Sequence, residues 1–429
     1  MNYDVIVIGG GPSGLMACVS AGMHGARVLL VEKGNKLGRK LAISGGGRCN
    51  VTNNKDIDEL IKNIPGNGRF MYSSFSVFNN RDIINFFEGM GIKLKEEDRG
   101  RMFPVSDKAK DVVNALIRKV KEVGTHIRLY SPVKHVRYDN GQVIGITLSS
   151  GEKIDAPCVI VATGGKSVPH TGSTGDGYKW AQEAGHTITE LYPTEVPIVS
   201  NEEWIQNREL QGLSLRNVQL SVWNAKGKKV TEQEGDMIFT HFGISGPAAL
   251  RCSQFVVKAL KQSQTQEVLM TIDLFPEKSV EDIRNETFTL AENEPKKAIK
   301  NVLKGYIPER MVHLVLRKAG LSGETTFSHI PKAPWAEMAR LLKQFPLYVH
   351  GTLSIEEAFV TGGGVHLKEI DPRTMQSKLM PGLFFCGEIL DVHGFTGGYN
   401  ITVAFSSGYT AGKSAAERSL EIQQTTFSQ

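Results

Sequence analysis

The chain has 429 residues, which is too many for one ordinary hydrophobic core, so we expect two or three domains. Its 40% hydrophobic and 22% charged residues are typical of soluble globular proteins, and the net charge of +5 falls short of a nucleic-acid-binding footprint. No apolar run approaches the ~20 residues that span a bilayer, and the sequence begins in a predicted strand without the features of a signal peptide. A cytoplasmic protein without membrane contact is therefore expected.

The cysteine and glycine content limits the kinds of functional site that the protein can contain. The cysteines are scattered, with no C-x-x-C or C-x4-C pair: Cys18, Cys49, Cys158, Cys252 and Cys386. This spacing argues against a disulfide framework, a zinc site and a dithiol redox centre, so we expect no metal. The 45 glycines cluster in a few loops, as backbone-mediated ligand binding would require.

Residues 3–33 contain the clearest local motif, a predicted βαβ unit. An apolar strand is followed by Gly9-Gly10-Gly11-Pro12-Ser13-Gly14, a helical segment and a second apolar strand that ends before Glu32. In a G-x-G-x-x-G turn the first glycine makes the tight turn, the second admits a pyrophosphate and the third lets helix and strand pack closely, while the terminal acid binds ribose hydroxyls. The motif predicts a dinucleotide site formed by Gly9, Gly11, Pro12, Ser13, Gly14, Glu32 and Lys33.

The next segment, residues 34–54, is rich in glycine and cations and shows no periodicity. Positive side chains and exposed backbone N–H groups in one loop can hold an anion, so the loop is either part of the cofactor site or a mobile surface loop. Cys49 is either a reactive thiol or a small buried apolar residue. The cofactor-binding candidates here are Lys40, Ser44, Gly45, Gly46, Gly47, Arg48, Cys49 and Asn50.

Residues 56–184 alternate between helical and strand patterns. Helices are predicted over 57–64, 81–90, 107–121 and 178–184, and the aromatic stretch 70–78 is interpreted as core. Short strands at 127–129, 133–138, 143–148 and 153–154 predict a β-meander, whose residue Val133 is a cofactor-binding candidate. The apolar strand 156–162 ends in Thr163, Gly164 and Gly165, at the edge where open α/β sheets bind ligands.

From about residue 190 the pattern changes. Residues 190–275 alternate in short runs that predict a small β-barrel or sandwich, interrupted by a turn that contains His241. His241 could act as an acid or base, or be a structural histidine. Residues 277–345 are predicted to be helical, with an excess of basic residues between Arg284 and Lys318 that indicates either an anionic partner or an ordinary solvated face.

The C-terminal part returns to the first pattern. A buried strand, residues 383–386, is followed by Gly387-Glu388, a glycine-rich loop and a helix from Ile401 to Glu417. We therefore expect a discontinuous Rossmann-type domain, residues 1–190 and 352–429, with an inserted β-barrel, residues 191–276 and 322–351, and a helical subdomain, residues 277–321. The candidates in the return are Gly387, Glu388, Gly397, Gly398, Tyr399, Asn400 and Ile401.

This order of elements resembles the FAD-binding superfamily with the glutathione-reductase type of Rossmann domain. The resemblance implies an α/β fold in which FAD lies extended, with its adenosine on the first βαβ unit. It also implies that the helix near Ile401 directs its N-terminal N–H groups at the flavin ring, where its dipole stabilises the anionic reduced form.

More closely, five motifs resemble the bacterial BaiN/YhiN-type flavoproteins: SGGGRCNVTN from Ser44, GRMFP from Gly100, TGDGY from Thr174, THFGISGP from Thr240 and GFTGGYN from Gly394. The resemblance covers nearly the whole chain. It implies non-covalent FAD and NAD(P)H-linked hydride transfer at flavin N5. Reduction of activated C=C bonds, including a uracil ring in RNA, and amine oxidation are associated with such proteins. No second G-x-G-x-x-G turn follows a strand, so NAD(P)H would bind transiently in the substrate cleft.

Three functions remain open at this point. The first is a small-molecule reductase or oxidase, the second a flavoprotein that acts on RNA through the basic helical insertion, and the third a non-catalytic flavin-binding protein. The residue that delivers the proton is not identified by the sequence; Tyr399, His241 and His393 are the candidates.

Overall fold

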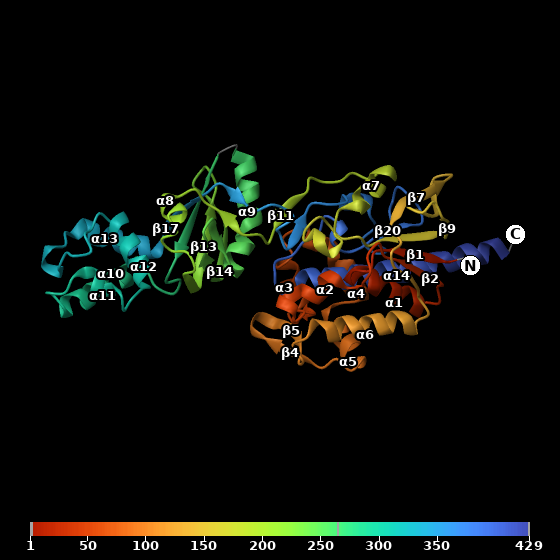
Figure 1. The fold of residues 1–429 in the computed structure, drawn as a ribbon, viewed down its shortest axis with the longest axis horizontal. Helices are drawn as coiled ribbons and strands as arrows, with labels where there is room; N and C mark the ends of the chain where they lie inside the picture. The colour runs from red at the N-terminus through yellow and green to blue at the C-terminus, as the bar shows by residue number, and fades with distance from the viewer. Residues whose placement is uncertain (1–2, 264–265, 428–429) are drawn as a thin grey trace. The chain divides into compact units, whose positions relative to one another are not determined.

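The computed structural model describes residues 3–263 and 266–427, and the chain divides into two compact units. Unit 1 takes Met1–Tyr192 and Ile355–Gln429, and unit 2 takes Pro193–Ser354. Figure 1 shows that the red N-terminal and blue C-terminal segments share one unit. Unit 1 is therefore discontinuous in sequence, and unit 2 is an insertion.

The centre of unit 1 is a parallel sheet of five strands in the order β20 (Leu383–Phe385), β10 (Cys158–Val161), β1 (Val5–Ile8), β2 (Val28–Val31) and β6 (His126–Arg128). Four of these strands are apolar runs with every residue buried, as expected of a parallel sheet covered on both faces. The α/β fold class and the C-terminal return are thus confirmed.

A strand does form near residue 127, as predicted, but it pairs with a different strand from the one predicted. β6 does not belong to the meander; it extends the parallel sheet beside β2. The helix α6 (Ala109–Glu122) precedes it and allows the parallel connection, which a tight hairpin turn cannot make. The meander consists of β7 (Val133–Asp139), β8 (Gln142–Leu148) and β9 (Lys153–Asp155), paired antiparallel.

Two helices far apart in sequence pack closely in unit 1. α1 (Pro12–Met23) lies along α14 (Tyr399–Phe427), as the red and blue helices show in Figure 1. The approach requires glycine, because a Cβ on Gly408 would clash with the Ser13 carbonyl oxygen and one on Gly412 with that of Ala17. The helix begins at Tyr399, two residues before the predicted start.

Smaller elements complete unit 1. β3 (Thr52–Asn53), β5 (Arg101–Pro104) and β4 (Leu94–Glu97) form an antiparallel sheet. Further helices and strands here are α2 (Arg39–Ile43), α3 (Ile57–Lys62), α4 (Tyr72–Val77), α5 (Asn80–Gly89), α7 (Asp176–Glu183) and β19 (Val360–Gly362). In the aromatic stretch Phe75 is buried in the core as predicted, whereas Tyr72 is 45% exposed.

Unit 2 contains a seven-stranded antiparallel sheet in the order β17 (Phe345–Val349), β16 (Val268–Asp273), β13 (Ser214–Trp223), β14 (Lys229–Phe239), β15 (Gly243–Ser245), β12 (Ile198–Val199) and β18 (Gly351–Thr352). The two edge strands, β17 and β18, are separated only by His350. One bent segment therefore pairs with β16 at one end and with β12 at the other, which closes the sheet into the predicted barrel.

Unit 2 also contains helices, whose buried side chains share one hydrophobic cluster with those of the sheet. They are α8 (Glu203–Gln206), α9 (Pro247–Ser263), α10 (Val280–Asn293), α11 (Ile299–Leu303), α12 (Glu309–Lys318) and α13 (Lys332–Lys343). Within the stretch predicted to be helical, residues 295–298 instead form a turn and a bridge before α11. Among the described residues, no helix combines the length and apolar character needed to cross a membrane.

Candidate cofactor and active site

The glycine-rich turn between β1 and α1 is packed at two positions and open at a third. Gly9 has a φ of +105°, and a Cβ there would lie 2.5 Å from the Ala162 carbonyl oxygen. A Cβ on Gly14 would clash with the Gly9 carbonyl oxygen, whereas one on Gly11 would meet nothing within 4 Å. Gly11 also caps α1 without a side-chain hydrogen bond, so the helix start offers N–H groups to an anion in this open space.

Glu32 organises the turn at the end of β2. Its Oε2 accepts the Gly10 N–H at 2.8 Å, and its Oε1 accepts the Gly34 N–H at 2.7 Å. The Glu32 carbonyl oxygen accepts the Ser131 N–H at 2.9 Å, which brings the start of β7, with Val133, to the same edge of the sheet. The sequence-predicted acid thus contacts the glycine turn, and the meander candidate Val133 follows two residues after Ser131.

A second cluster joins Lys40 on α2 to Glu388 beyond β20. Lys40 Nζ lies 2.7 Å from Glu388 Oε2 and donates to Ser167 Oγ at 2.8 Å, and Glu388 Oε1 accepts the Thr361 N–H at 2.7 Å. Burial disfavours the charged form of Glu388, but Lys40 and the hydrogen bonds outweigh it and hold its pKa below the usual value. The side chain of Glu388 is 20% exposed and that of Lys40 is 24% exposed, so both are mostly buried.

The residues that follow β10 lie beside this cluster. Lys166 and Ser167 donate their N–H groups to Thr361 Oγ1 at 2.9 and 3.0 Å, which places the Thr163-Gly164-Gly165 segment against β19. A Cβ on Gly165 would clash with the Thr361 side chain. The sequence reasoning missed Ser167 and Thr361. Their signal was available, since each lies beside a glycine-rich segment at the end of a strand.

The return loop meets the loop of residues 44–53. A Cβ on Gly398 would lie 2.9 Å from Asn50 Oδ1, and Asn53 Nδ2 donates to the Gly397 carbonyl oxygen at 3.0 Å. Asn400 braces its own loop, because its side chain accepts the Gly394 N–H at 2.7 Å and donates to the Gly394 carbonyl oxygen at 2.8 Å. The glycines at 397 and 398 and the start of α14 are thereby fixed next to Asn50.

Buried polar atoms in this part of unit 1 fit a large polar ligand. Asn50 Oδ1, Thr163 Oγ1 and the Tyr178 hydroxyl are buried and have no hydrogen-bond partner among the described residues. Burial, and then the charges of Glu388 and Asp391, raise the pKa of Tyr178. Because buried polar groups are almost always satisfied, a ligand with several donors and acceptors accounts for them. FAD is such a ligand, and the open space at Gly11 suits its pyrophosphate.

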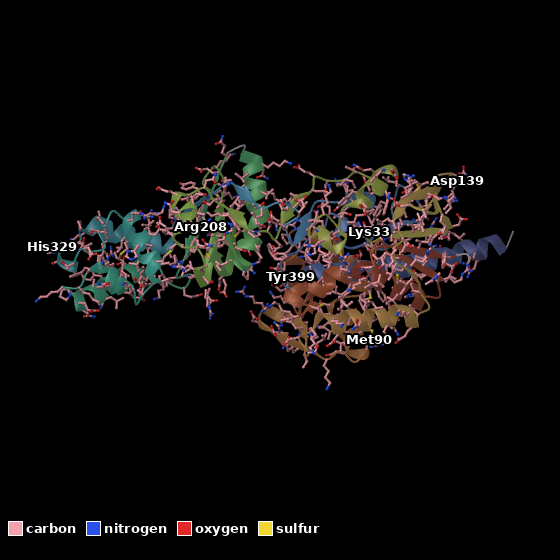
Figure 2. All side chains as sticks on the ribbon, viewed as in Figure 1. Lys33, Met90, Asp139, Arg208, His329 and Tyr399 are labelled. Atoms are coloured by element: carbon pink, nitrogen blue, oxygen red, sulfur yellow. The ribbon has the colours of Figure 1, made fainter. Side chains whose placement is uncertain are left out.

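Some predicted cofactor residues are engaged elsewhere. Arg48 pairs with Glu97 and with Asp107, and its guanidinium lies 4.2 Å from the centre of the Phe103 ring. Lys33 Nζ lies 2.6 Å from Asp176 Oδ2. Figure 2 labels Lys33 and Tyr399, both on unit 1.

Cys49 is completely buried, and burial raises the pKa of its thiol to about 12. A thiol with that pKa stays protonated at neutral pH, so the environment favours the interpretation of Cys49 as a small buried residue.

The three candidates for proton delivery lie in different environments. His393 is fully buried, its Nε2 lies 2.9 Å from the Tyr192 hydroxyl, and its backbone pairs with Gly66. Tyr399 is 4% exposed at the start of α14. His241 is exposed and belongs to unit 2, between β14 and β15.

The glycine turn, the carboxyl-edge loops and the C-terminal return define a Rossmann-type FAD-binding flavoprotein. The chain belongs to the HI0933-like family, because the model described as "HI0933-like protein Rossmann domain" matches residues 3–414. The resemblance drawn from the motifs is confirmed.

Curated relatives match almost end to end. The chain is 32% identical to the ribosomal RNA dihydrouridine synthase of Escherichia coli, over 95% of this chain and 96% of the relative. It is 29% identical to the 3-dehydro-bile acid delta(4,6)-reductase of Clostridium scindens, over 96% and 98%. The structure of 3-ketosteroid delta1-dehydrogenase from Sterolibacterium denitrificans is similar in fold, with a TM-score of 0.53, 13% identity, and coverage of 97% of this chain and 100% of that chain. These relatives are oxidoreductases, and the chain is a member of an FAD-binding oxidoreductase family.

Proposed function

We propose that the protein is an FAD-dependent reductase that adds two hydrogens across a C=C bond conjugated to a carbonyl group. The observation that carries the proposal is the near-complete match to relatives named for such reductions on different substrates, a uridine in ribosomal RNA and a 3-dehydro-bile acid. Both substrates contain an unsaturated ring with a carbonyl in conjugation. The two relatives therefore share the type of reaction, reduction of a conjugated C=C bond in a ring, although their substrates differ.

We assign the cofactor to the residues that the geometry brings together. The N–H groups at the start of α1 and the space at Gly11 would hold the pyrophosphate, Glu32 the adenosine ribose, and the Lys40–Glu388 cluster with Asn50 the flavin end. Bound FAD supplies two-electron chemistry, accepting a hydride from NAD(P)H and delivering one to the substrate. We propose non-covalent binding, since the Cys49 thiol of the glycine-rich loop is buried and protonated.

The substrate also needs a proton, and we assign its delivery to the return loop. Tyr399 begins α14, and His393 is joined to Tyr192. Burial, and then Asp391, raise the pKa of Tyr192, so its hydroxyl stays protonated and holds the His393 ring in place through their 2.9 Å contact. Tyr399→Phe and His393→Asn should each leave FAD content unchanged, and the variant that removes the donor should slow product formation by ~10²-fold or more.

The test of the reaction uses protein reduced with dithionite in the absence of oxygen. A cyclic enone should restore the flavin absorbance near 450 nm and be recovered with two additional hydrogens by mass spectrometry. Gly11→Val, which should lack FAD, is the matched control. The proposal fails if the reduced protein is reoxidised by oxygen but yields no saturated product from enones or from uridine in RNA.

The second candidate function is reduction of a uracil ring in ribosomal RNA. It is favoured by the matches to the Escherichia coli and Haemophilus influenzae enzymes of that name, at 32% and 31% identity. A readout is the appearance of dihydrouridine in unmodified ribosomal RNA incubated with the protein and NADPH, and its absence with Gly11→Val.

The helical insertion carries less available charge than its sequence suggested. Most of its basic residues are paired with acids: Lys278 with Glu286, Arg284 with Glu281, Lys297 with Glu294, Lys300 with Glu324, Lys304 with Glu309, Arg317 with Glu209 and Lys318 with Glu202. Binding of RNA by the helical subdomain, residues 277–321, therefore stays a proposal. If the triple change of Lys296, Lys297 and Lys300 to Glu leaves RNA binding unaltered, this mode of binding is ruled out.

The non-catalytic alternative makes the opposite prediction about the donor. Anaerobic NADH or NADPH should bleach the 450 nm band of a reductase and leave that of a flavin-binding protein unchanged. Persistence of the band with both donors, together with failure of the dithionite test, would favour this alternative.

A further inference from the structure

A large open groove lies in unit 1, outside the residues assigned to FAD. Its volume is about 940 Å³, at the upper end of the range for small-molecule sites. The walls come from α3, from the segment that leads into α4, and from residues 367–378, which we call together the basic groove: Asp58, Ile61, Lys62, Ile64, Pro65, Asn67, Gly68, Arg69, Phe70, Tyr72, Leu367, Lys368, Ile370, Pro372 and Lys378.

The charge of the basic groove is strongly one-sided. Its lining contains four cations, Lys62, Arg69, Lys368 and Lys378, and one acid, Asp58. Asp58 accepts a hydrogen bond from the Tyr72 hydroxyl at 3.0 Å. Within the described residues Arg69 and Lys368 make no ion pair, in contrast to the paired cations of unit 2. Four positive side chains around one concavity attract an anion.

The groove is also suited to a flat, partly apolar group. Ile61, Ile64 and Leu367 contribute apolar surface, and Phe70 and Tyr72 contribute rings. The Tyr72 side chain is 45% exposed, so its ring is accessible. Aromatic rings beside cations are the combination that holds a base by stacking and its phosphate by charge.

The basic groove is physically joined to the return loop of the FAD domain. Gly66 donates its N–H to the His393 carbonyl oxygen at 3.0 Å, and His393 donates its N–H to the Gly66 carbonyl oxygen at 3.1 Å. Asn67 Nδ2 donates to the Asp391 carbonyl oxygen at 2.7 Å. The lip of the groove and the loop that carries Tyr399 are therefore held together by three hydrogen bonds.

We propose that the basic groove is the docking site for the phosphates and adenosine of the nicotinamide dinucleotide that reduces the enzyme, with a preference for NADPH over NADH. The proposal rests on the reductase function proposed above, which needs a donor although the sequence contains only one G-x-G-x-x-G turn after a strand. A groove of small-molecule size suits a dinucleotide, which is itself a small molecule. The 2'-phosphate of NADPH adds negative charge for Arg69 and Lys368. The donor gives one hydride to FAD and leaves as NADP⁺, while one solvent proton completes the reduction.

The test compares Arg69→Glu and Lys368→Glu with the control Lys110→Glu, which reverses an exposed charge in the first turn of α6, away from the groove. Each purified holoprotein is reduced anaerobically with increasing NADPH or NADH, and binding of NADP⁺ to the oxidised protein is measured by calorimetry. We expect the concentration of NADPH for half-maximal reduction to rise at least tenfold in both groove variants and less than twofold in the control. The preference for NADPH should shrink, and FAD content should not change.

Other outcomes overturn the inference. It fails if the groove variants bind NADP⁺ and use NADPH like the control, if the wild-type protein binds neither dinucleotide, or if the variants lose only binding to ribosomal RNA. Dithionite reduction followed by enone addition keeps the two proposals apart. If the dithionite-reduced protein reduces enones, but Arg69→Glu is reduced by NADPH as readily as the wild type, the proposed function stands. The assignment of the donor site to the basic groove is then wrong.

Discussion

Replacement of Lys40 by methionine tests the electrostatic argument for the FAD domain most directly. The change removes an ammonium that lies 2.7 Å from Glu388 and preserves most of the apolar stem. Glu388 keeps its hydrogen bonds from Ser167 and Thr361 but loses the charge that offsets its burial. Breaking a fully buried ion pair costs about 3–5 kcal/mol. Because both side chains are partly exposed, we expect Lys40→Met to lower the free energy of unfolding by about 2 kcal/mol at pH 7.5.

The pH dependence gives the sharper readout. In the wild-type protein the lowered pKa of Glu388 contributes stability above the pKa of the unfolded chain, and this is lost as pH falls through the folded value. In Lys40→Met, burial without the ammonium should raise that pKa above the unfolded value, so the folded state takes up a proton first. The destabilisation should therefore be largest at pH 7.5 and should shrink toward pH 5.

The assay is thermal unfolding of the apoprotein, followed by circular dichroism at pH 5, 6, 7 and 8. A loss of about 2 kcal/mol corresponds to roughly 4–8 °C in a domain of this size. The matched control is the double variant Lys40→Met, Glu388→Gln, which removes the unpaired charge and should recover much of the loss with little pH dependence. An equal loss at pH 5 and pH 8, or no recovery in the double variant, would refute the reasoning.

The remaining predictions concern backbone packing and a buried histidine. Gly11→Val should fold with a normal melting temperature yet contain no flavin absorbance, because its side chain enters open space meant for phosphate; stoichiometric FAD would disprove this placement. Gly412→Ala should destabilise the α1–α14 contact by about 1–3 kcal/mol in the same melting assay, since its Cβ meets the Ala17 carbonyl oxygen, and an unchanged melting temperature would contradict it. Burial lowers the pKa of His186 despite Glu369, so wild-type stability should fall from pH 7.5 to 5.5 and His186→Gln should flatten that slope; parallel pH profiles would argue against this role.

Local patterns were sufficient for much of the FAD domain. The strands β1, β2, β10 and β20 are uninterrupted apolar runs, and such runs can only be buried on both faces. The glycine turn was equally informative, because close packing at Gly9 and Gly14 leaves no room for a side chain. The sequence by itself therefore determined the fold class, the FAD-binding character and the existence of an insertion.

Partners distant in sequence were decided only by the tertiary structure. The residues of β6 indicate a strand, but their pairing with β2 depends on the crossover through α6. Lys40 and Glu388 meet across 348 positions of sequence. The cations of the helical insertion looked available until Glu202 and Glu209 were found beside Lys318 and Arg317. Sequence patterns report the environment each side chain requires, whereas the identity of the neighbour depends on how the whole chain closes.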